Sequence, residues 1–181
     1  MSELFPKLPL DNNRYNDYLG SVPGKLAAEI RQTKPFDLIE EEAALNIVRT
    51  AEVLSQHTAG FLRDFQLSQT QYNVLRILRG AGPAGATCSQ IGERMINHDP
   101  DITRLLDRLE ARGLIARERS KEDRRVVITR ISPEGLALLG SIDEPLRKYL
   151  RDHMGKVGRA GLEALIGHLE QVRELFTASN S

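Results

Sequence analysis

Apolar residues recur along most of this chain at spacings of three and four, the period of an amphipathic helix. Long stripes of this kind run through 38–65, from residue 134 onward and through about 156–176, and a shorter one occupies 99–113. The pattern changes at 126–131, where β-branched residues favour a strand. The sequence therefore predicts a mainly α-helical fold with a small β-hairpin.

The helix predicted over 99–113 has one apolar face and one polar face. Asp99 suits the N-cap, Pro100 the first helical position, and Gly113 the end. With the apolar stripe facing the core, the polar face is left outward and has the form of a helix that enters a DNA major groove. Its members are Thr103, Arg104, Asp107 and Arg108, with Asp101 at the N-terminal tip.

A shorter helix is predicted over 87–96, directly before this one. Thr87 and Gln90 have the spacing of a capping box, and Ile91 and Met95 would pack inward. Two such helices joined by a short loop match a helix-turn-helix, in which the first helix crosses the phosphate backbone. Ser89 and Gln90 are therefore candidate phosphate contacts.

A hairpin follows, with predicted strands at 115–119 and 126–131 and a tip at 120–125. Lys121, Arg124 and Arg125 in this tip can reach phosphates or a narrow minor groove. We expect the Asp123 carboxylate to accept a hydrogen bond from the Arg125 guanidinium and to hold that side chain in one pose. A helix-turn-helix followed by a basic hairpin predicts a winged helix-turn-helix.

Charge is balanced over the whole chain, with 25 basic and 25 acidic side chains, but it is not evenly distributed. The segment 104–130 holds nine basic and five acidic residues, a net charge of +4. Such local asymmetry lets one face attract phosphate. Charge runs are more often solvated surface, and it is the helix-turn-helix context that favours DNA here.

Two segments carry a specific family resemblance: LSQTQYNVLRIL at 67–78 and DITRLLDRLEARGLIARERSKEDRRVVITRISPEG at 101–135. They resemble the MarR family of winged-helix transcriptional regulators, and the likeness extends over 38–176, about three quarters of the chain. It includes the family's Asp-x-Arg wing element at 123–125. The resemblance implies a homodimer that binds a pseudo-palindromic operator, often as a repressor released by a small phenolic ligand.

Asp101 departs from the resembled pattern, which more often has a small or hydroxylated residue at that position. Its carboxylate can accept a hydrogen bond from cytosine N4, or it can stabilise the helix start through the helix dipole. We favour the role at the helix start.

The chain divides into four predicted regions. These are an N-terminal extension (1–36), a dimerisation helix (37–66), a DNA-binding lobe (67–132) and C-terminal dimerisation helices (133–178). Ser132 and Pro133 are the expected N-cap and first residue of the helix after the wing. The long helices carry more apolar surface than one lobe can cover, so a partner subunit is expected.

Other chemistry receives little support from the sequence. Phe61, Phe65, Tyr72 and Arg76 are candidates for an effector pocket, although aromatic residues at helical spacing are more often core. Cys88, the single cysteine, is expected to pack behind its helix rather than to sense oxidants. We expect no catalytic site, metal or cofactor, because the chain lacks a phosphate-binding glycine loop and a shared ligand spacing among its histidines.

The first 35 residues contain four prolines and one short helical segment near 25–31. They lack the apolar core of a signal peptide, and the chain has no apolar run long enough to span a membrane, so a cytoplasmic protein is expected. Two functions remain open: a DNA-binding regulator, and a winged-helix module that binds proteins without DNA. We favour the regulator, because a protein-docking module has no need of Arg104, Arg108, Arg124 and Arg125 for phosphate contacts.

Overall fold

The structure is a computed structural model that describes residues 24–97, 101–120 and 122–178. The chain forms two compact units, 1–58 and 59–181. The described part of the first unit contains the short helix α2 (Lys25–Glu29) and most of the long helix α3 (Ile39–Arg63), which continues into the second unit. Arg49 on α3 forms an ion pair with Glu29 of α2 at 4.0 Å.

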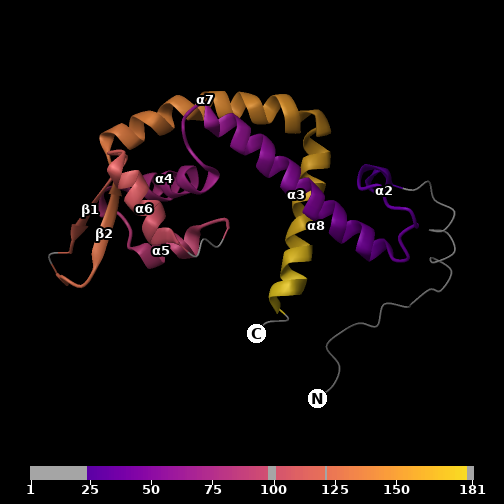
Figure 1. The fold of residues 1–181 in the computed structure, drawn as a ribbon, viewed down its shortest axis with the longest axis horizontal. Coiled ribbons are helices and arrows are strands. Elements are labelled where there is room, and N and C mark those ends of the chain that lie inside the picture. Colours follow the sequence, from indigo (N-terminus) through magenta and orange to yellow (C-terminus); the bar gives the residue numbers. More distant parts are fainter. Residues whose placement is uncertain (1–23, 98–100, 121, 179–181) are drawn as a thin grey trace, which may run out of the picture. The chain divides into compact units, whose positions relative to one another are not determined.

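The second unit begins with a small lobe of helices and a two-stranded wing, coloured magenta to orange in Figure 1. Its elements are α4 (Gln69–Ala81), the 3-10 turn η1 (Gly82–Ala84), α5 (Cys88–Arg94), α6 (Ile102–Ala111), β1 (Ile115–Arg119) and β2 (Val127–Ile131). The strands are antiparallel, and Ile115 pairs with Ile131. This confirms the predicted helix-turn-helix and hairpin, with the second strand one residue shorter than expected.

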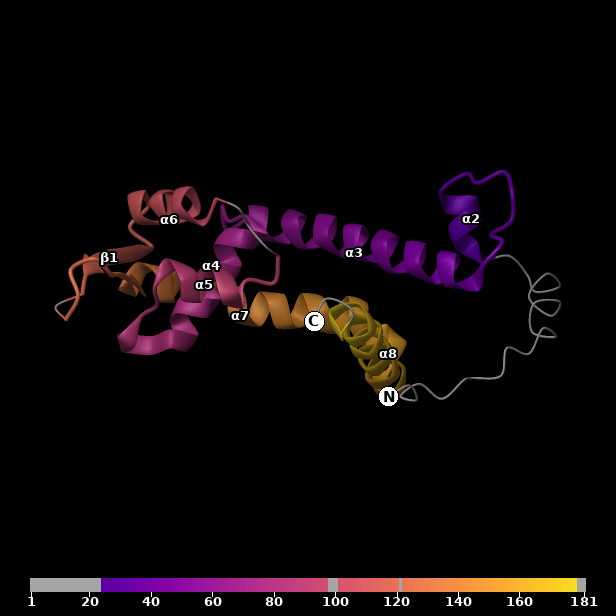
Figure 2. The same ribbon diagram turned by 90° about the horizontal axis from the view of Figure 1, so that it is seen from below.

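Two long helices complete the unit: α7 (Pro133–Met154) and, after the 3-10 turn η2 (Gly155–Val157), α8 (Arg159–Ala178). Both views show α7 leading away from the lobe, with α8 at its far end and the wing on the other side of the lobe (Figures 1 and 2). Ser132 caps α7 by accepting a hydrogen bond from Gly135 N, and Pro133 is the first helical residue. Both assignments at this helix start are thereby confirmed.

The core of the second unit lies among α4, α5, α6, β1 and the first half of α7. Its fully buried side chains come from each helix in turn, because each presents one apolar stripe inward. They include Leu75, Leu78, Ile91, Leu109, Leu139 and Ile142. This core fixes α6 and the wing in one geometry.

Close backbone approaches join the wing to the rest of the lobe. Ala86 forms an isolated antiparallel bridge with Thr129 of β2, with N–O distances of 2.9 and 2.8 Å, which the sequence pattern did not predict. Gly85 before it has φ +70°, and an added Cβ there would lie 2.5 Å from the Thr129 carbonyl oxygen. Only glycine therefore allows this contact.

Candidate nucleic-acid interface

Helix α6 is held by distinct signals at its two ends. Asp101 is the N-cap, and its carboxylate Oδ1 accepts a hydrogen bond from Arg104 N at 3.4 Å. At the other end Gly113 has φ +69°, and the bonds Gly113 N to Glu110 O and Leu114 N to Leu109 O form a Schellman motif. The predicted stop at Gly113 is confirmed.

The predicted start of this helix is wrong by two residues. The helix begins at Ile102 with Asp101 as its N-cap, whereas the sequence-based prediction places the cap at Asp99 and the first helical residue at Pro100. His98, Asp99 and Pro100 lie outside the described residues, and Pro100 therefore remains only a sequence-based candidate for DNA contact. Of the two roles considered for Asp101, the structure supports the one at the helix start.

The polar face of α6 points to solvent as predicted. Thr103, Arg104, Asp107 and Arg108 are exposed, while Leu105, Leu106 and Leu109 are buried beneath them. Arg104 Nε lies 3.3 Å from Asp101 Oδ2, so these two charges compensate each other. Arg108 forms no hydrogen bond or ion pair with any residue that the structure describes.

Helix α5 begins with the predicted capping box. Gln90 N donates to Thr87 Oγ1, and Thr87 N donates to Gln90 Oε1. The Oε1 atom of Gln90 is thus engaged in the cap. Ser89 Oγ donates to Glu93 at 3.2 Å, and the side chains of Ser89 and Gln90 are both exposed.

The other side of α5 faces the core. Ile91 is fully buried and Met95 half-buried, as expected, whereas Cys88 is exposed. The prediction that Cys88 packs behind the helix is therefore wrong, because its place in the first turn faces solvent.

The wing tip is ordered by short-range bonds to the backbone. Ser120 Oγ accepts from Glu122 N and Asp123 N, and Asp123 Oδ1 accepts from Arg125 N at 2.9 Å. The carboxylate therefore holds the turn and not the Arg125 guanidinium, which corrects the expectation from sequence. The physical reason is proximity: a backbone N–H two residues away is the usual partner in an Asx turn.

The arginines of the tip are exposed. Neither Arg124 nor Arg125 has a side-chain partner among the residues described, which leaves both guanidinium groups available. Arg119 supports the tip from β1 by donating to the Arg124 carbonyl oxygen at 3.0 Å. Lys121 lies outside the described residues.

A clamp between α6 and the wing was not predicted. Arg117 on β1 donates to Asp107 Oδ1 at 2.6 Å and to Glu110 Oε2 at 2.5 and 2.9 Å. The hydrogen bond from Arg117 holds the pKa of the Glu110 carboxyl below its usual range, and the same bond raises the pKa of Arg117. The clamp binds two carboxylates of α6 with one guanidinium, so it offsets one of their two negative charges. No local sequence pattern signals it, because the partners meet only after the chain reverses at Gly113.

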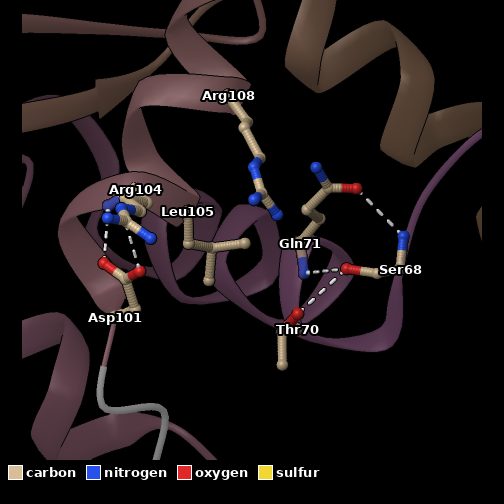
Figure 3. A pocket seen from close by; sticks show the side chains of 7 residues that line it. All are labelled: Ser68, Thr70, Gln71, Asp101, Arg104, Leu105 and Arg108. Atoms are coloured by element: carbon tan, nitrogen blue, oxygen red, sulfur yellow. Dashed lines mark hydrogen bonds and ion pairs between the residues drawn. The ribbon is translucent and has the colours of Figure 1, made fainter.

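A polar pocket of about 260 Å³ lies between the start of α4 and the first half of α6 (Figure 3). Ser68, the N-cap of α4, forms a capping box with Gln71, and its hydroxyl also lies 2.9 Å from that of Thr70. Sequence reasoning assigned no role to this side of the pocket. The lining residues are Ser68, Thr70, Gln71, Asp101, Arg104, Leu105 and Arg108.

The four candidate effector residues partly converge. The rings of Phe61 and Phe65 lie 5.5 Å apart, and Phe61 lies 5.2 Å from Tyr149 of α7. Phe61, Phe65 and Tyr72 are half-buried against the core, where burial raises the pKa of Tyr72. Arg76 is exposed, with its guanidinium 5.8 Å from the Tyr72 ring centre. Phe61, Phe65 and Tyr72 therefore pack against the core, in line with the core role considered for them.

Comparison with known proteins decides the family. The family model described as MarR family matches residues 67–127, which include α4, α5, α6 and β1. A crystal structure of a MarR transcription factor from Planctomyces limnophilus is 39% identical, with a TM-score of 0.59, and the match covers 75% of this chain and 98% of that one. The chain belongs to the MarR family. MarR proteins are DNA-binding transcriptional regulators rather than enzymes, and this protein is one of them.

Other relatives agree with this assignment. The transcriptional regulator PecS from Dickeya dadantii is 31% identical over 111 residues, which span 59% of this chain and 67% of PecS. BpsR from Bordetella bronchiseptica was solved to explain the regulation of its DNA binding by 6-hydroxynicotinic acid. It has a TM-score of 0.67 at 21% identity over 77% of this chain and 98% of BpsR, a likeness of fold. Within the described ranges, no helix of this MarR protein is long and apolar enough to cross a membrane.

Proposed function

We propose that this MarR protein is a homodimeric repressor that binds a pseudo-palindromic operator through α6 and the wing. The observation that carries the proposal is the pair of exposed arginines at the wing tip, held beside a recognition helix whose polar face is also exposed. In this arrangement α6 reads base edges in the major groove, and Arg124 and Arg125 contact the flanking minor groove or its phosphates.

The site we assign combines the two elements of the helix-turn-helix with the wing tip. Ser89 and Gln90 contact phosphate from α5, where both side chains are exposed. Asp123 acts indirectly by shaping the turn that carries Arg125. The DNA contacts we propose are Ser89, Gln90, Pro100, Thr103, Arg104, Arg108, Lys121, Arg124 and Arg125, with Asp101 and Asp107 as part of the same face.

A dimer is supported by exposed apolar residues on the long helices. Leu150 on α7 is 46% exposed, and Ile166 and Phe176 on α8 are 55% and 74% exposed. Burying the exposed part of such a side chain against a second copy stabilises the assembly by about 1–2 kcal/mol. We accordingly assign 37–66 and 133–178 to dimerisation and 67–132 to DNA binding. Two lobes then present two recognition helices, as a pseudo-palindrome requires.

Release by a small phenolic ligand is the regulatory part of the proposal. It is supported by the regulation of DNA binding by 6-hydroxynicotinic acid in BpsR, which has the same fold. In this chain the half-buried aromatics Phe61, Phe65 and Tyr72, with Arg76 beside them, offer ring contacts and a cation. They lie next to α7, which the Arg79–Asp143 ion pair ties to α4. A ligand that tilts α7 would change the spacing between the two recognition helices.

The test is fluorescence anisotropy on duplexes tiled across the DNA upstream of the gene for this protein, at several salt concentrations. The proposal expects one short pseudo-palindrome to bind tightly, with log Kd depending linearly on log salt concentration. Arg125→Ala should weaken that binding. It should also lower the slope of log Kd against log salt concentration by about 0.9 for each phosphate contact that is lost. Arg151→Ala, which removes an exposed arginine on α7, is the matched control.

Three results would contradict parts of the proposal. If Arg125→Ala binds the operator with the same affinity as the Arg151→Ala control, the wing is not part of the DNA interface. Salt-insensitive traces on every duplex would instead favour the protein-interaction module. A monomer at the concentrations that saturate the operator would refute the dimer.

A further inference from the structure

The pocket between α4 and α6 brings Arg108, one of the DNA contacts proposed above, beside hydrogen-bond donors of α4 that the proposed DNA-binding site does not include. On the α6 side, the Arg108 guanidinium points across the pocket toward Gln71 (Figure 3). This guanidinium has no partner within the described parts of the chain. A cation directed into a polar pocket is suited to bind an anion.

The α4 side supplies further donors. Gln71 Oε1 accepts the hydrogen bond from Ser68 N, which fixes the orientation of the amide and turns its Nε2 group away from the cap, on the side of Arg108 (Figure 3). The Ser68 and Thr70 hydroxyls lie 2.9 Å apart and form a hydrogen bond in which either can be the donor. The hydroxyl that accepts this bond keeps its own hydrogen free to donate into the pocket. A guanidinium, an amide and a hydroxyl together match the several oxygens of a phosphate group.

The charge and the position of the pocket also favour phosphate. Its one carboxylate, Asp101, is compensated by Arg104 at 3.3 Å, so the charge that remains is that of Arg108. The Arg104 side chain is 77% exposed, so the pocket opens on the same side as the polar face of α6. With α6 in the major groove, as proposed above, a strand of DNA that borders this groove would pass the opening.

We propose that the pocket binds one phosphate group of the DNA backbone, held by Arg108, Gln71 and the Thr70 hydroxyl. This inference rests on the proposed function, because it requires α6 to lie in the major groove. It adds α4 as a further element of the interface and gives Arg108 a phosphate contact rather than a base contact. The contact fixes the register of α6 on the duplex without reading sequence.

The decisive variant is Gln71→Glu. A carboxylate at this position still accepts the hydrogen bond from Ser68 N, because glutamate serves as well as glutamine in a capping box. Its negative charge near the start of α4 also favours the helix. The variant therefore keeps the fold while it replaces an amide donor with a group that repels phosphate. Gln171→Glu on α8 introduces the same charge change elsewhere. It serves as control because Gln171 is exposed and lies on the face of α8 opposite the apolar residues Leu162, Ile166 and Leu169, which we assign to the dimer.

The measurement is anisotropy on the operator and on a random duplex over a range of salt concentrations. Gln71→Glu should raise Kd about tenfold or more on both duplexes, as expected when a hydrogen bond to a charged group is removed. The slope of log Kd against log salt should fall by about 0.9. Arg108→Ala should lower the slope similarly, and combining it with Gln71→Glu should add little, because both act on the same phosphate.

A second arm separates DNA from free phosphate as the source of the anion. Thermal unfolding is followed with and without inorganic phosphate at constant ionic strength. If phosphate stabilises the protein, Gln71→Glu abolishes this, and DNA binding is the same in both glutamate variants, then the pocket binds a free anion and the proposal is overturned.

The remaining outcomes are equally definite. If Gln71→Glu binds DNA like Gln171→Glu while the unmodified protein binds with the expected salt dependence, this inference fails and the proposed function stands. If the unmodified protein shows no salt-dependent binding to any duplex, the proposed function fails and this inference with it.

Discussion

The winged lobe and helix α8 belong to the same structural unit, yet they place their large apolar side chains differently. In the lobe, Leu75, Leu78 and Leu109 are fully buried. On α8, which the structure describes over its whole length, no residue is buried, and Phe176 is 74% exposed. Because a buried leucine contributes about 1.5–3 kcal/mol, the lobe is stabilised by its own packing. The exposed side chains of α8 gain such energy only from another surface.

Ion pairs show the same contrast. In the lobe several of them join different elements: Arg117 links β1 to α6, and Arg79 links α4 to Asp143 of α7 through two hydrogen bonds of 2.8 and 3.2 Å. On α8 the pair between Arg159 and Glu163 lies within one helix and is largely exposed. Pairs between elements fix geometry, and exposed pairs within a helix contribute little. The lobe is thus held in one geometry by its own contacts, whereas α8 is the surface that we propose for assembly.

The largest effect is expected when a leucine is shortened in the lobe. Leu109→Ala removes a fully buried side chain and should lower the free energy of unfolding by about 3 kcal/mol. Leu165→Ala on α8, where the leucine is 41% exposed, should cost far less in dilute protein. Urea denaturation at several protein concentrations measures both. Equal losses that do not depend on concentration would remove the distinction between the two regions.

The next effect tests α8 as an assembly surface. Ile166→Glu places a charge on an apolar position that is 55% exposed in the single chain. It should raise the dimer dissociation constant by about thirtyfold, near 2 kcal/mol, because an unpaired charge is then buried at the interface. Analytical ultracentrifugation provides the measurement, and Gln171→Glu is the control. If both variants remain dimers of unchanged affinity, the interface lies elsewhere.

A smaller effect is expected from the ion pair between α4 and α7. Arg79→Ala should cost about 1.5 kcal/mol, at the low end for charged hydrogen bonds, because the side chains of Arg79 and Asp143 are 36% and 28% exposed. Arg159→Ala on α8 should cost under about 0.5 kcal/mol. Chemical denaturation at neutral pH compares the two, and similar costs would show that the pair does not fix α7.

This pair also sets a dependence on pH. The hydrogen bond from Arg79 lowers the pKa of the Asp143 carboxyl below its ordinary value. Its contribution is therefore fully present above about pH 4 and is lost as pH falls through the lowered pKa. The stability difference between the unmodified protein and Arg79→Ala should shrink on acidification. A difference that stays constant between pH 6 and pH 2 would contradict this assignment.

The smallest effect separates the two roles considered for Asp101. Asp101→Ala should cost about 1 kcal/mol of stability, because it removes the N-cap of α6, whereas Asp101→Asn keeps a good cap and should cost little. Thermal unfolding reports the cap. Operator affinity of Asp101→Asn reports base reading, and a changed preference at a cytosine would show that the carboxylate also contacts the base.

The local elements of the lobe were predictable because their signals are local. The capping box at Thr87, the stop at Gly113 and the cap at Ser132 each need only a few neighbouring residues, and all three are confirmed. The start of α6 was misplaced because Asp99 and Asp101 are both suitable caps and Pro100 suits a first turn. The choice between the two caps depends on the three-dimensional path of the chain, which places the N-cap at Asp101.

The sequence by itself determined the helix-turn-helix, the wing and the outward arginines, since hydrophobic period and capping chemistry act within a few residues. The tertiary structure decided which of those polar groups remain available. In the folded protein Asp107 and Glu110 bind Arg117, and the Asp123 carboxylate accepts a hydrogen bond from the backbone. Gln71 and Arg108 line the same pocket. These partners are distant in the sequence or compete with near alternatives, so their pairing follows from packing of the elements and not from the spacing of residues along the chain.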